Sequence, residues 1–294
     1  MSAGATDLRE EYVESRRALL DAIDALEPQS DAVILAGAQA IYVRTGGGGL
    51  PISDFTTDGD LALDPTLLAD APTLAVLMRS AGFDLAVLQG AEEPGIWEKP
   101  VTIRGTKGKV QVDLIVPRGA APPGGTRGAR LPSHGNRAAR KATGLEAALV
   151  DNETMLIEAL DPADKRSARI RVAGFGALLV AKAHKLRDRL DSGRDDRVDD
   201  KDASDIVQIM RATTPATIAA GLASLQAHPT AGPSVRAGLE YFEELFGKNR
   251  AAPGIEMAVR AMRIAMPEER VQAICLAYAD ALQQALAETE ELSP

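Results

Sequence analysis

A short stretch, Phe55–Asp64, constrains the fold of this chain more than any other segment. It places Asp58 and Asp60 in a segment whose polar and apolar alternation is typical of a strand. Residues two apart on a strand project to the same face, so their Cα atoms would lie about 6–7 Å apart. Carboxylates that close repel each other unless a cation lies between them. The pair therefore fits a site for Mg²⁺, which prefers oxygen ligands, or an ordinary surface strand edge.

Composition narrows the class of protein. The 294 residues are 45% hydrophobic and 26% charged, which is typical of a globular chain with a substantial core. Aromatic residues make up only 3%, so aliphatic side chains must fill that core, and this favours helices. The net charge of −9 argues against a chain coated with nucleic acid but allows a local basic groove. We find no signal peptide and no apolar run of about 18 residues, and we expect a cytoplasmic protein.

Hydrophobic periodicity predicts an α+β protein. In the N-terminal half it predicts helices over 7–26, 38–45 and 65–81, the last interrupted at Pro72. It predicts strands over 32–36, 83–88, 96–104 and 109–117, in addition to the Asp58 strand, with turns at 90–95 and 105–108. From residue 151 the pattern is almost entirely helical, except for a strand over 168–172. We therefore expect a lobe with a mixed sheet and flanking helices over 1–150 and a helical lobe over 151–294.

Two further segments carry charges that allow two interpretations each. Asp113 is the lone carboxylate in an apolar strand, so it is either a sheet-edge residue or a third carboxylate facing Asp58 and Asp60. The segment 117–145 has no acidic residue, so it is either a solvated loop or a phosphate-contacting surface. Its basic residues are Arg118, Arg127, Arg130, Arg137, Arg140 and Lys141.

Five motifs in order resemble the nucleotidyltransferase-fold toxins of the AbiEii type, including the mycobacterial MenT group. The motifs span about 170 residues, well over half the chain. They are LAGAQA (Leu35–Ala40), FTTDGDL (Phe55–Leu61), VDLI (Val112–Ile115), LLVAKAHKLRDR (Leu178–Arg189) and KDASDI (Lys201–Ile206). The resemblance implies a nucleotidyltransferase fold in the N-terminal lobe and a helical lobe that closes the nucleotide cleft.

The resemblance also implies which residues bind metal and nucleotide. Asp58 and Asp60 would hold Mg²⁺, and Asp113 would complete the metal site or deprotonate the nucleophile. Backbone at the strand–helix turn Gly37-Ala38 would contact phosphate. Many nucleotidyltransferases have Gly-Ser or Gly-Gly at this turn. Ala38 has no hydroxyl to contact phosphate, so that contact would be made by the backbone or by Thr56 and Thr57.

A lysine and an aspartate of the helical lobe complete the implied catalytic set. Lys182 would supply a positive charge to the triphosphate, although a surface lysine on an amphipathic helix is the alternative. The functional aspartate of KDASDI is expected to be Asp205, which precedes an apolar pair. Asp202 is the alternative for that role, and it could instead be a helix N-cap.

The resemblance implies a toxin that transfers NMP from an NTP to the 3′ end of tRNA and so blocks translation. Its cognate antitoxin or regulator would be a separate chain. Within the basic segment, Arg127, Arg130 and Arg137 are the expected tRNA contacts. The alternatives are a non-catalytic nucleotide-binding or interaction module of the same fold, or a nucleotidyltransferase with a protein or small-molecule acceptor.

Overall fold

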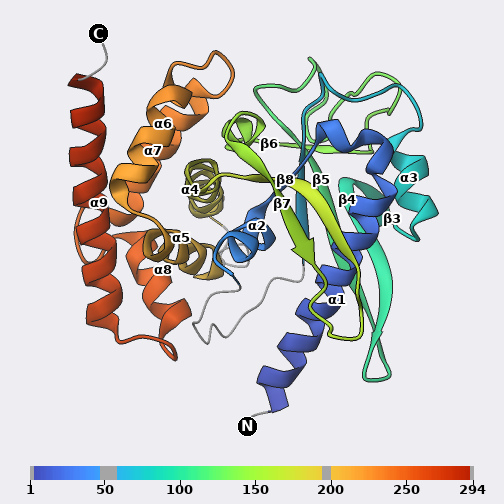
Figure 1. Cartoon of the computed structure of the whole chain (residues 1–294), viewed down its shortest axis with the longest axis horizontal. Helices are drawn as coiled ribbons and strands as arrows, with labels where there is room; N and C mark the ends of the chain where they lie inside the picture. The colour runs from blue at the N-terminus through green and yellow to red at the C-terminus, as the bar shows by residue number, and fades with distance from the viewer. Residues whose placement is uncertain (1–2, 47–57, 194–199, 292–294) are drawn as a thin grey trace. The chain divides into compact units, whose positions relative to one another are not determined.

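The computed structural model describes residues 3–46, 58–193 and 200–291 (Figure 1). It has an N-terminal mixed sheet with helices and a largely helical C-terminal region, as predicted. The chain divides into two compact units. Unit 1 comprises Met1–Gln39, Phe55–Ala142 and Asn152–Val172, and unit 2 comprises Ala40–Asp54, Thr143–Asp151 and Ala173–Pro294. Each unit is therefore built from three separate segments of the chain.

Unit 1 is built on a mixed eight-stranded sheet, with strand order β3-β4-β5-β2-β1-β8-β7 and with β6 paired to β5. Strand β1 pairs antiparallel with β2 and parallel with β8, while β2 pairs parallel with β5. The strands are β1 (Val33–Ala36), β2 (Asp58–Leu63), β3 (Asp84–Leu88), β4 (Ala91–Ile103), β5 (Thr106–Pro117), β6 (Arg140–Ala142), β7 (Asn152–Glu158) and β8 (Ser167–Ala173).

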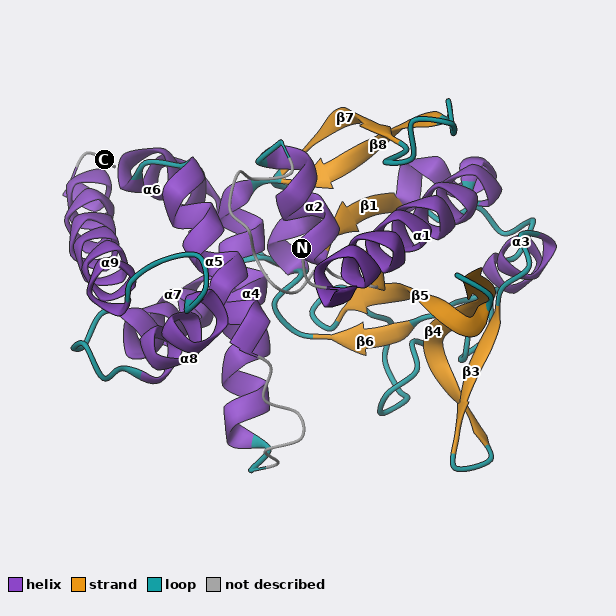
Figure 2. Ribbon diagram, turned by 90° about the horizontal axis from the view of Figure 1, so that it is seen from below, coloured by secondary structure: helices purple, strands orange, loops and turns teal. Residues whose placement is uncertain are grey.

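Strand β1, near the middle of this sheet, is fully apolar. All four residues of β1 are buried, as expected for a short hydrophobic run between two neighbouring strands. Helix α1 (Ala3–Ala25) packs across β2, β4 and β5 (Figure 2). Its Leu19 lies so close to Gly59 that a Cβ on Gly59 would be 3.1 Å from the Leu19 Cδ1 atom. Gly59 therefore faces α1.

Two tight turns replace the broader turns predicted in this region. Gln89-Gly90 joins β3 to β4 and Arg104-Gly105 joins β4 to β5, and both residues of each pair have positive φ. Two-residue turns of this kind match the twist of the flanking strands. The predictions of turns over 90–95 and 105–108 are therefore wrong, because most of those residues continue the strands.

The helix prediction for 65–81 is correct only at its end. Helix α3 spans Leu74–Ser80 and begins after Thr73, whose hydroxyl accepts a hydrogen bond from the Val76 amide. Pro72, just before this cap, explains why the helix does not start earlier. No sequence pattern predicts strand β7, because only Ile157 among its residues is buried and its sequence lacks clear alternation.

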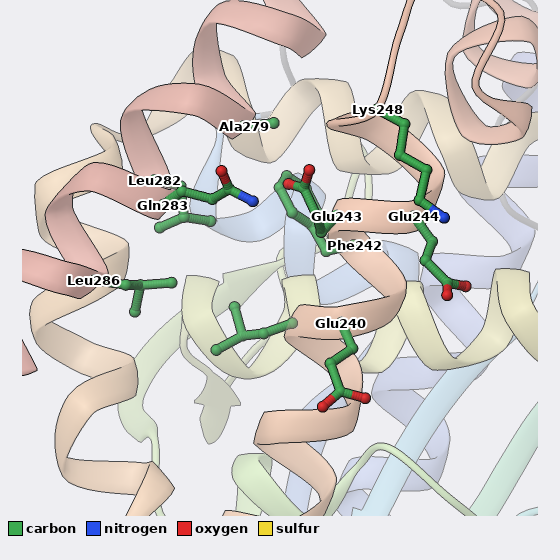
Figure 3. A pocket seen from close by; sticks show the side chains of 10 residues that line it. Glu240, Phe242, Glu243, Glu244, Lys248, Ala279, Leu282, Gln283 and Leu286 are labelled. Atoms are coloured by element: carbon green, nitrogen blue, oxygen red, sulfur yellow. The ribbon is translucent and has the colours of Figure 1, made fainter.

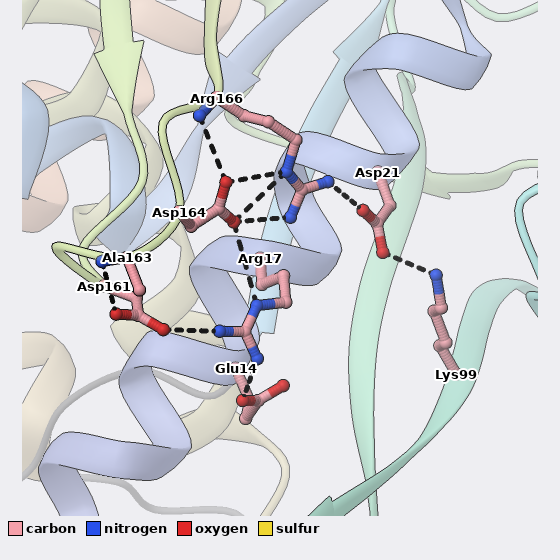
Figure 4. A network of polar contacts seen from close by, with 8 residues as sticks. All are labelled: Glu14, Arg17, Asp21, Lys99, Asp161, Ala163, Asp164 and Arg166. Atoms are coloured by element: carbon pink, nitrogen blue, oxygen red, sulfur yellow. Dashed lines mark hydrogen bonds and ion pairs between the residues drawn. The ribbon is translucent and has the colours of Figure 1, made fainter.

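Ion pairs connect α1 to two other parts of unit 1 (Figure 4). Lys99 of β4 pairs with Asp21 at 2.5 Å, and Arg17 pairs with Asp161 at 2.9 Å. Hydrogen bonds from Arg166 lower the pKa of the Asp164 carboxyl to about 2. These groups are partly or fully exposed, so each ion pair alone adds little to the stability of the fold. Several linked pairs together contribute more.

Unit 2 contains the end of α2 (Gly37–Arg44), the 3₁₀ turn η2 (Glu146–Leu149) and the C-terminal helices. Helix α4 packs against α5, α6 and α7, and α9 packs against α5, α6, α7 and α8. Within the described residues, no helix is long and apolar enough to cross a membrane. The C-terminal helices are α4 (Phe175–Asp191), α5 (Asp200–Ala212), α6 (Pro215–Gln226), α7 (Gly232–Phe246), α8 (Pro253–Met262) and α9 (Glu268–Glu291).

Candidate functional site

The register of three neighbouring strands brings two of the predicted aspartates together. Asp60 on β2 is the Cα partner of Asp113 on β5 and, on its other side, of Ala36 at the end of β1. Paired residues of neighbouring strands lie about 4.8 Å apart and project to the same face. Asp113 is therefore an interior residue of the sheet beside Asp60, and the edge interpretation is wrong, because β5 lies between β4 and β2.

The carboxylates project from the face of the sheet opposite α1. Gly59 faces α1, so its neighbours Asp58 and Asp60 face the other side. Gln111, the partner of Asp58, lies on that same side together with Asp113. The structure thus gathers three carboxylates and one amide on one surface, although Asp58 is exposed and Asp113 is buried.

The turn from β1 into α2 lies against Asp60. Gly37 is the first residue of α2 and has a φ of +64°, a conformation that favours glycine. A Cβ on Gly37 would lie 1.9 Å from the Asp60 Oδ2 atom, so any larger residue would displace the carboxylate. Ala38 follows as a buried helix residue. Thr56 and Thr57, the other predicted nucleotide contacts, lie outside the described residues.

Both oxygens of Asp113 already have partners. Its Oδ1 atom accepts a hydrogen bond from the Gln111 amide at 2.8 Å. Its Oδ2 atom accepts two from the Arg140 guanidinium, at 3.0 Å from Nε and 2.7 Å from Nη2. Burial raises the pKa of the Asp113 carboxyl, Arg140 opposes that rise and Asp60 adds to it. Arg140 is therefore the counter-ion of Asp113.

Sheet pairing and a close packing contact hold Arg140 in place. Strand β6 pairs parallel with β5, and Arg140 is the partner of Ile115. Gly95 of β4 has a φ of +73°, and a Cβ there would lie 2.2 Å from the Arg140 backbone nitrogen. Only glycine allows this approach. No pattern in the sequence predicts this contact; Arg140 is recognisable there only as one residue of a basic segment.

The predicted metal site fits these residues only in part. Asp58 and Asp60 share a face and could contribute oxygen ligands to Mg²⁺, which binds few protein carboxylates and retains water. Asp113 does not fit the role of ligand in this arrangement, because Arg140 and Gln111 occupy its oxygens. Among the described residues, no group of three His, Cys, Asp or Glu side chains is placed to hold a metal ion.

In unit 2, Lys182 lies between the two aspartates that the sequence offered as alternatives. Its Nζ atom is 2.6 Å from Asp202 and 2.6 Å from Asp205, and all three side chains are buried. Burial lowers the pKa of Lys182, but the two carboxylates more than offset it and the pKa is raised. The surface-lysine interpretation is wrong, and so is the N-cap interpretation of Asp202, which is the third residue of α5.

Three more cations surround this ion pair. Lys185 and Arg189 of α4 lie 3.2 Å and 2.5 Å from Asp202, and they follow Lys182 by three and seven residues on the same helix face. Burial lowers the pKa of Lys201, which lies near Asp205. Two carboxylates and four basic groups therefore meet in this α4–α5 cluster. The helical spacing on α4 was the signal that could have identified Lys185 and Arg189.

The basic segment is more structured than a solvated loop. Part of it forms β6, and Arg140 lies against Asp113. Two of the expected tRNA contacts form ion pairs with β4: Arg127 with Glu93 at 2.6 Å and Arg137 with Glu92 at 3.3 Å. Arg130 is exposed. The positive charge of this segment is therefore partly neutralised by neighbouring acidic residues.

Comparisons of the chain with models of protein families, with curated proteins and with solved structures find no match.

Proposed function

We propose that this chain is a nucleotidyltransferase, with its site on the sheet surface beside the N-terminus of α2. The observation that carries the proposal is the register that sets Asp60 between Asp113 and the β1–α2 turn. Asp60 lies against the start of α2, whose first residue must be glycine, and the buried Asp113 lies beside Asp60. This combination suits a phosphate ester, because a helix N-terminus attracts anions and carboxylates can handle protons and cations. The nucleotidyltransferase fold suggested by the five motifs is part of the same proposal.

In this mechanism, the acceptor hydroxyl loses its proton to Asp113 and attacks the α-phosphorus of an NTP. The new bond joins the acceptor oxygen to phosphorus, and the bond to the β-phosphate oxygen breaks, releasing pyrophosphate. Burial and Asp60 raise the pKa of Asp113, which makes it a stronger base, while Arg140 holds the carboxylate in one orientation. Backbone N–H groups at Gly37 and Ala38 would bind phosphate oxygens.

Mg²⁺, if bound by Asp58 and Asp60, would neutralise charge on the phosphates. In unit 2, Asp202 and Asp205 hold Lys182 protonated, so this lysine carries the positive charge that the motif resemblance implies for it.

We further propose that the acceptor is the 3′ end of tRNA and that the protein is the toxin of a toxin–antitoxin pair. The motif resemblance supports this. Arg130 of the basic segment is exposed and, as predicted for it, would contact a tRNA phosphate. The antitoxin or regulator would be a separate chain.

The test is incubation of the purified chain with Mg²⁺, total tRNA and each of the four NTPs labelled at the α-phosphate. Asp60→Asn and Asp113→Asn should each lower transfer by about 10²- to 10⁴-fold. Asp84→Asn, an exposed aspartate on β3, is the matched control and should retain activity. Full activity in Asp60→Asn would reject the site. No transfer to tRNA, but transfer to a protein or small molecule, would reject the acceptor.

The rival proposal is a nucleotide-binding module without turnover. The observation that favours it is the Arg140–Asp113 ion pair, because a carboxylate with both oxygens occupied is poorly placed to accept a proton. NTP binding by calorimetry without label transfer to any acceptor would support this module.

A further inference from the structure

Helices α7 and α9 of unit 2 enclose a surface hollow of about 510 Å³ (Figure 3). This hollow is distinct from the carboxylate site and from the α4–α5 cluster, and nothing in the proposed activity uses it. In Figure 3, Leu282, Gln283 and Leu286 line it from α9, and Glu240, Glu243 and Lys248 are among the side chains from α7 and the residues after it.

The floor of the hollow is apolar and has helical spacing. Phe242 and Leu282 are 2% and 1% exposed and form its base. Leu239 is three residues before Phe242, and Leu286 is four residues after Leu282; both are half-buried. Rows of side chains three and four residues apart create the grooves in which a further helix packs.

The rim of the hollow is acidic. Exposed Glu240 and half-buried Glu243 line it together with Lys248, and exposed Asp280 of α9 is close enough to Glu243 to affect its pKa. Among the described residues, no ion pair within 4.0 Å involves Glu240, Glu243 or Asp280. Burial raises the pKa of Glu243 and the repulsion from Asp280 adds to the rise, while Lys248 opposes it. Glu244 is different, because it already pairs with Arg187 at 2.7 Å. The rim thus holds a negative charge that its own helices do not compensate.

We propose that this hollow docks a basic amphipathic helix from a partner protein. Its apolar side chains at positions i, i+3, i+4 and i+7 would cover the apolar floor, and its Lys or Arg side chains would pair with the three rim carboxylates. Helix α7 has 15 residues, so the contact extends over at most about 22 Å, or four helical turns. A second copy of this chain is a poor occupant, because a symmetric contact would set one acidic rim against the other.

The test uses two synthetic helical peptides of about 16 residues with the same leucine pattern, one carrying lysines and the other glutamates at the remaining positions. Fluorescence anisotropy with the full chain should show at least about tenfold tighter binding of the lysine peptide. The variant Glu240→Gln/Glu243→Gln/Asp280→Asn should weaken that binding by about five- to tenfold, as expected for three partly exposed ion pairs.

The matched control is Glu256→Gln/Glu268→Gln/Glu269→Gln, which changes the net charge equally at α8 and the start of α9. It should bind the lysine peptide like wild type. Leu286→Gln, at a half-buried position, should weaken both peptides, and thermal unfolding should show that all variants remain folded. Equal binding of the two peptides, or equal loss in the control, would overturn the proposal. A concentration-dependent dimer that Leu286→Gln dissociates would also overturn it, by making the occupant a second copy.

Discussion

The most consequential single residues are charged groups that lie where water cannot solvate them. Lys182 is 4% exposed, and its ammonium is compensated only because Asp202 and Asp205 lie beside it. Asp113 is 5% exposed, and Arg140 compensates it in the same way. Removing one partner of such a pair leaves a buried charge without compensation, and this costs far more than the pair itself contributes.

Lys182→Met should therefore lower the free energy of unfolding by about 3–5 kcal/mol, because two buried carboxylates lose their nearest cation. Chemical denaturation monitored by circular dichroism measures the change. Lys185→Met is the control: it contacts the same Asp202, but its side chain is 44% exposed, and the loss should stay below about 1 kcal/mol. Equal losses in the two variants would show that burial does not set the cost.

The ionisation of Asp202 should make the free energy of unfolding depend on pH. Burial alone would raise the pKa of this carboxyl, but Lys182, Lys185 and Arg189 outweigh it and hold the pKa below the usual 3.8. When folding lowers the pKa of a carboxyl, its charged form stabilises the folded state at pH values above the pKa of the unfolded chain. This stabilisation is lost as the pH falls through the pKa of the folded state.

The loss of unfolding free energy caused by Asp202→Asn should accordingly be large at pH 7 and shrink as the pH falls below about 4. Urea denaturation at pH 7, 5 and 3 measures it. Asp24→Asn, an exposed position on α1, should cost little at any of these pH values. A cost for Asp202→Asn that is the same at pH 7 and pH 3 would contradict the assignment.

At the scale of elements, helix starts and strand turns are set by a few residues. Helix α4 has Gly174 at its N-cap, which supplies no side-chain hydrogen bond. Asp151 fills this role from outside the helix: its Oδ2 atom accepts a hydrogen bond from the Ala177 amide at 3.0 Å. Its backbone carbonyl accepts another from the Gly174 amide at 2.7 Å. Since α4 carries Lys182, this cap also positions the charged cluster.

Asp151→Ala should destabilise the fold by about 1 kcal/mol, because an N-terminal amide of α4 loses its acceptor and the helix dipole loses a nearby negative charge. Asp151→Asn retains an acceptor oxygen and should recover part of the loss. Thermal and urea denaturation of both variants measure the effect. If Asn and Ala are equally destabilising, the hydrogen bond is not the source of the stabilisation.

For the whole molecule, the distribution of charge decides what a chain of net charge −9 can bind. The segment 117–145 has no acidic residue, yet Glu92 and Glu93 of β4 neutralise Arg137 and Arg127. The number of basic residues in this segment therefore overestimates its positive charge on the surface of the folded protein. Arg130 is the residue of the three whose charge is least compensated by β4.

If the segment contacts tRNA, Arg130→Gln should lower affinity and reduce the salt dependence by about one unit of log Kd per log[KCl]. The double variant Arg127→Gln/Arg137→Gln should have a smaller effect per residue, because those cations are already paired. Filter binding at several KCl concentrations measures both. Arg263→Gln, an exposed arginine beyond α8, is the control. A salt dependence unaffected by Arg130→Gln would exclude this segment from the interface.

Much of the architecture follows from local patterns. The apolar run of β1, the β2 strand with Asp58 and Asp60, and the C-terminal helices were all predictable, because each depends on side-chain periodicity over a few neighbouring residues. The local signal was insufficient for β7, whose residues are mostly exposed, and for the tight turns, where continuous strands replace predicted loops.

Tertiary structure alone decided which charges meet. The pairing of Asp60 with Asp113 depends on strand register across 53 residues of sequence, and Arg140 reaches Asp113 only because β6 joins the same sheet. The sequence also allowed Lys182 to be a surface lysine; it is buried between two aspartates because α5 packs against α4. The physical reason is that periodicity is a short-range property of the chain, whereas the partner of a buried charge is selected by long-range packing, through the cost of leaving that charge without compensation.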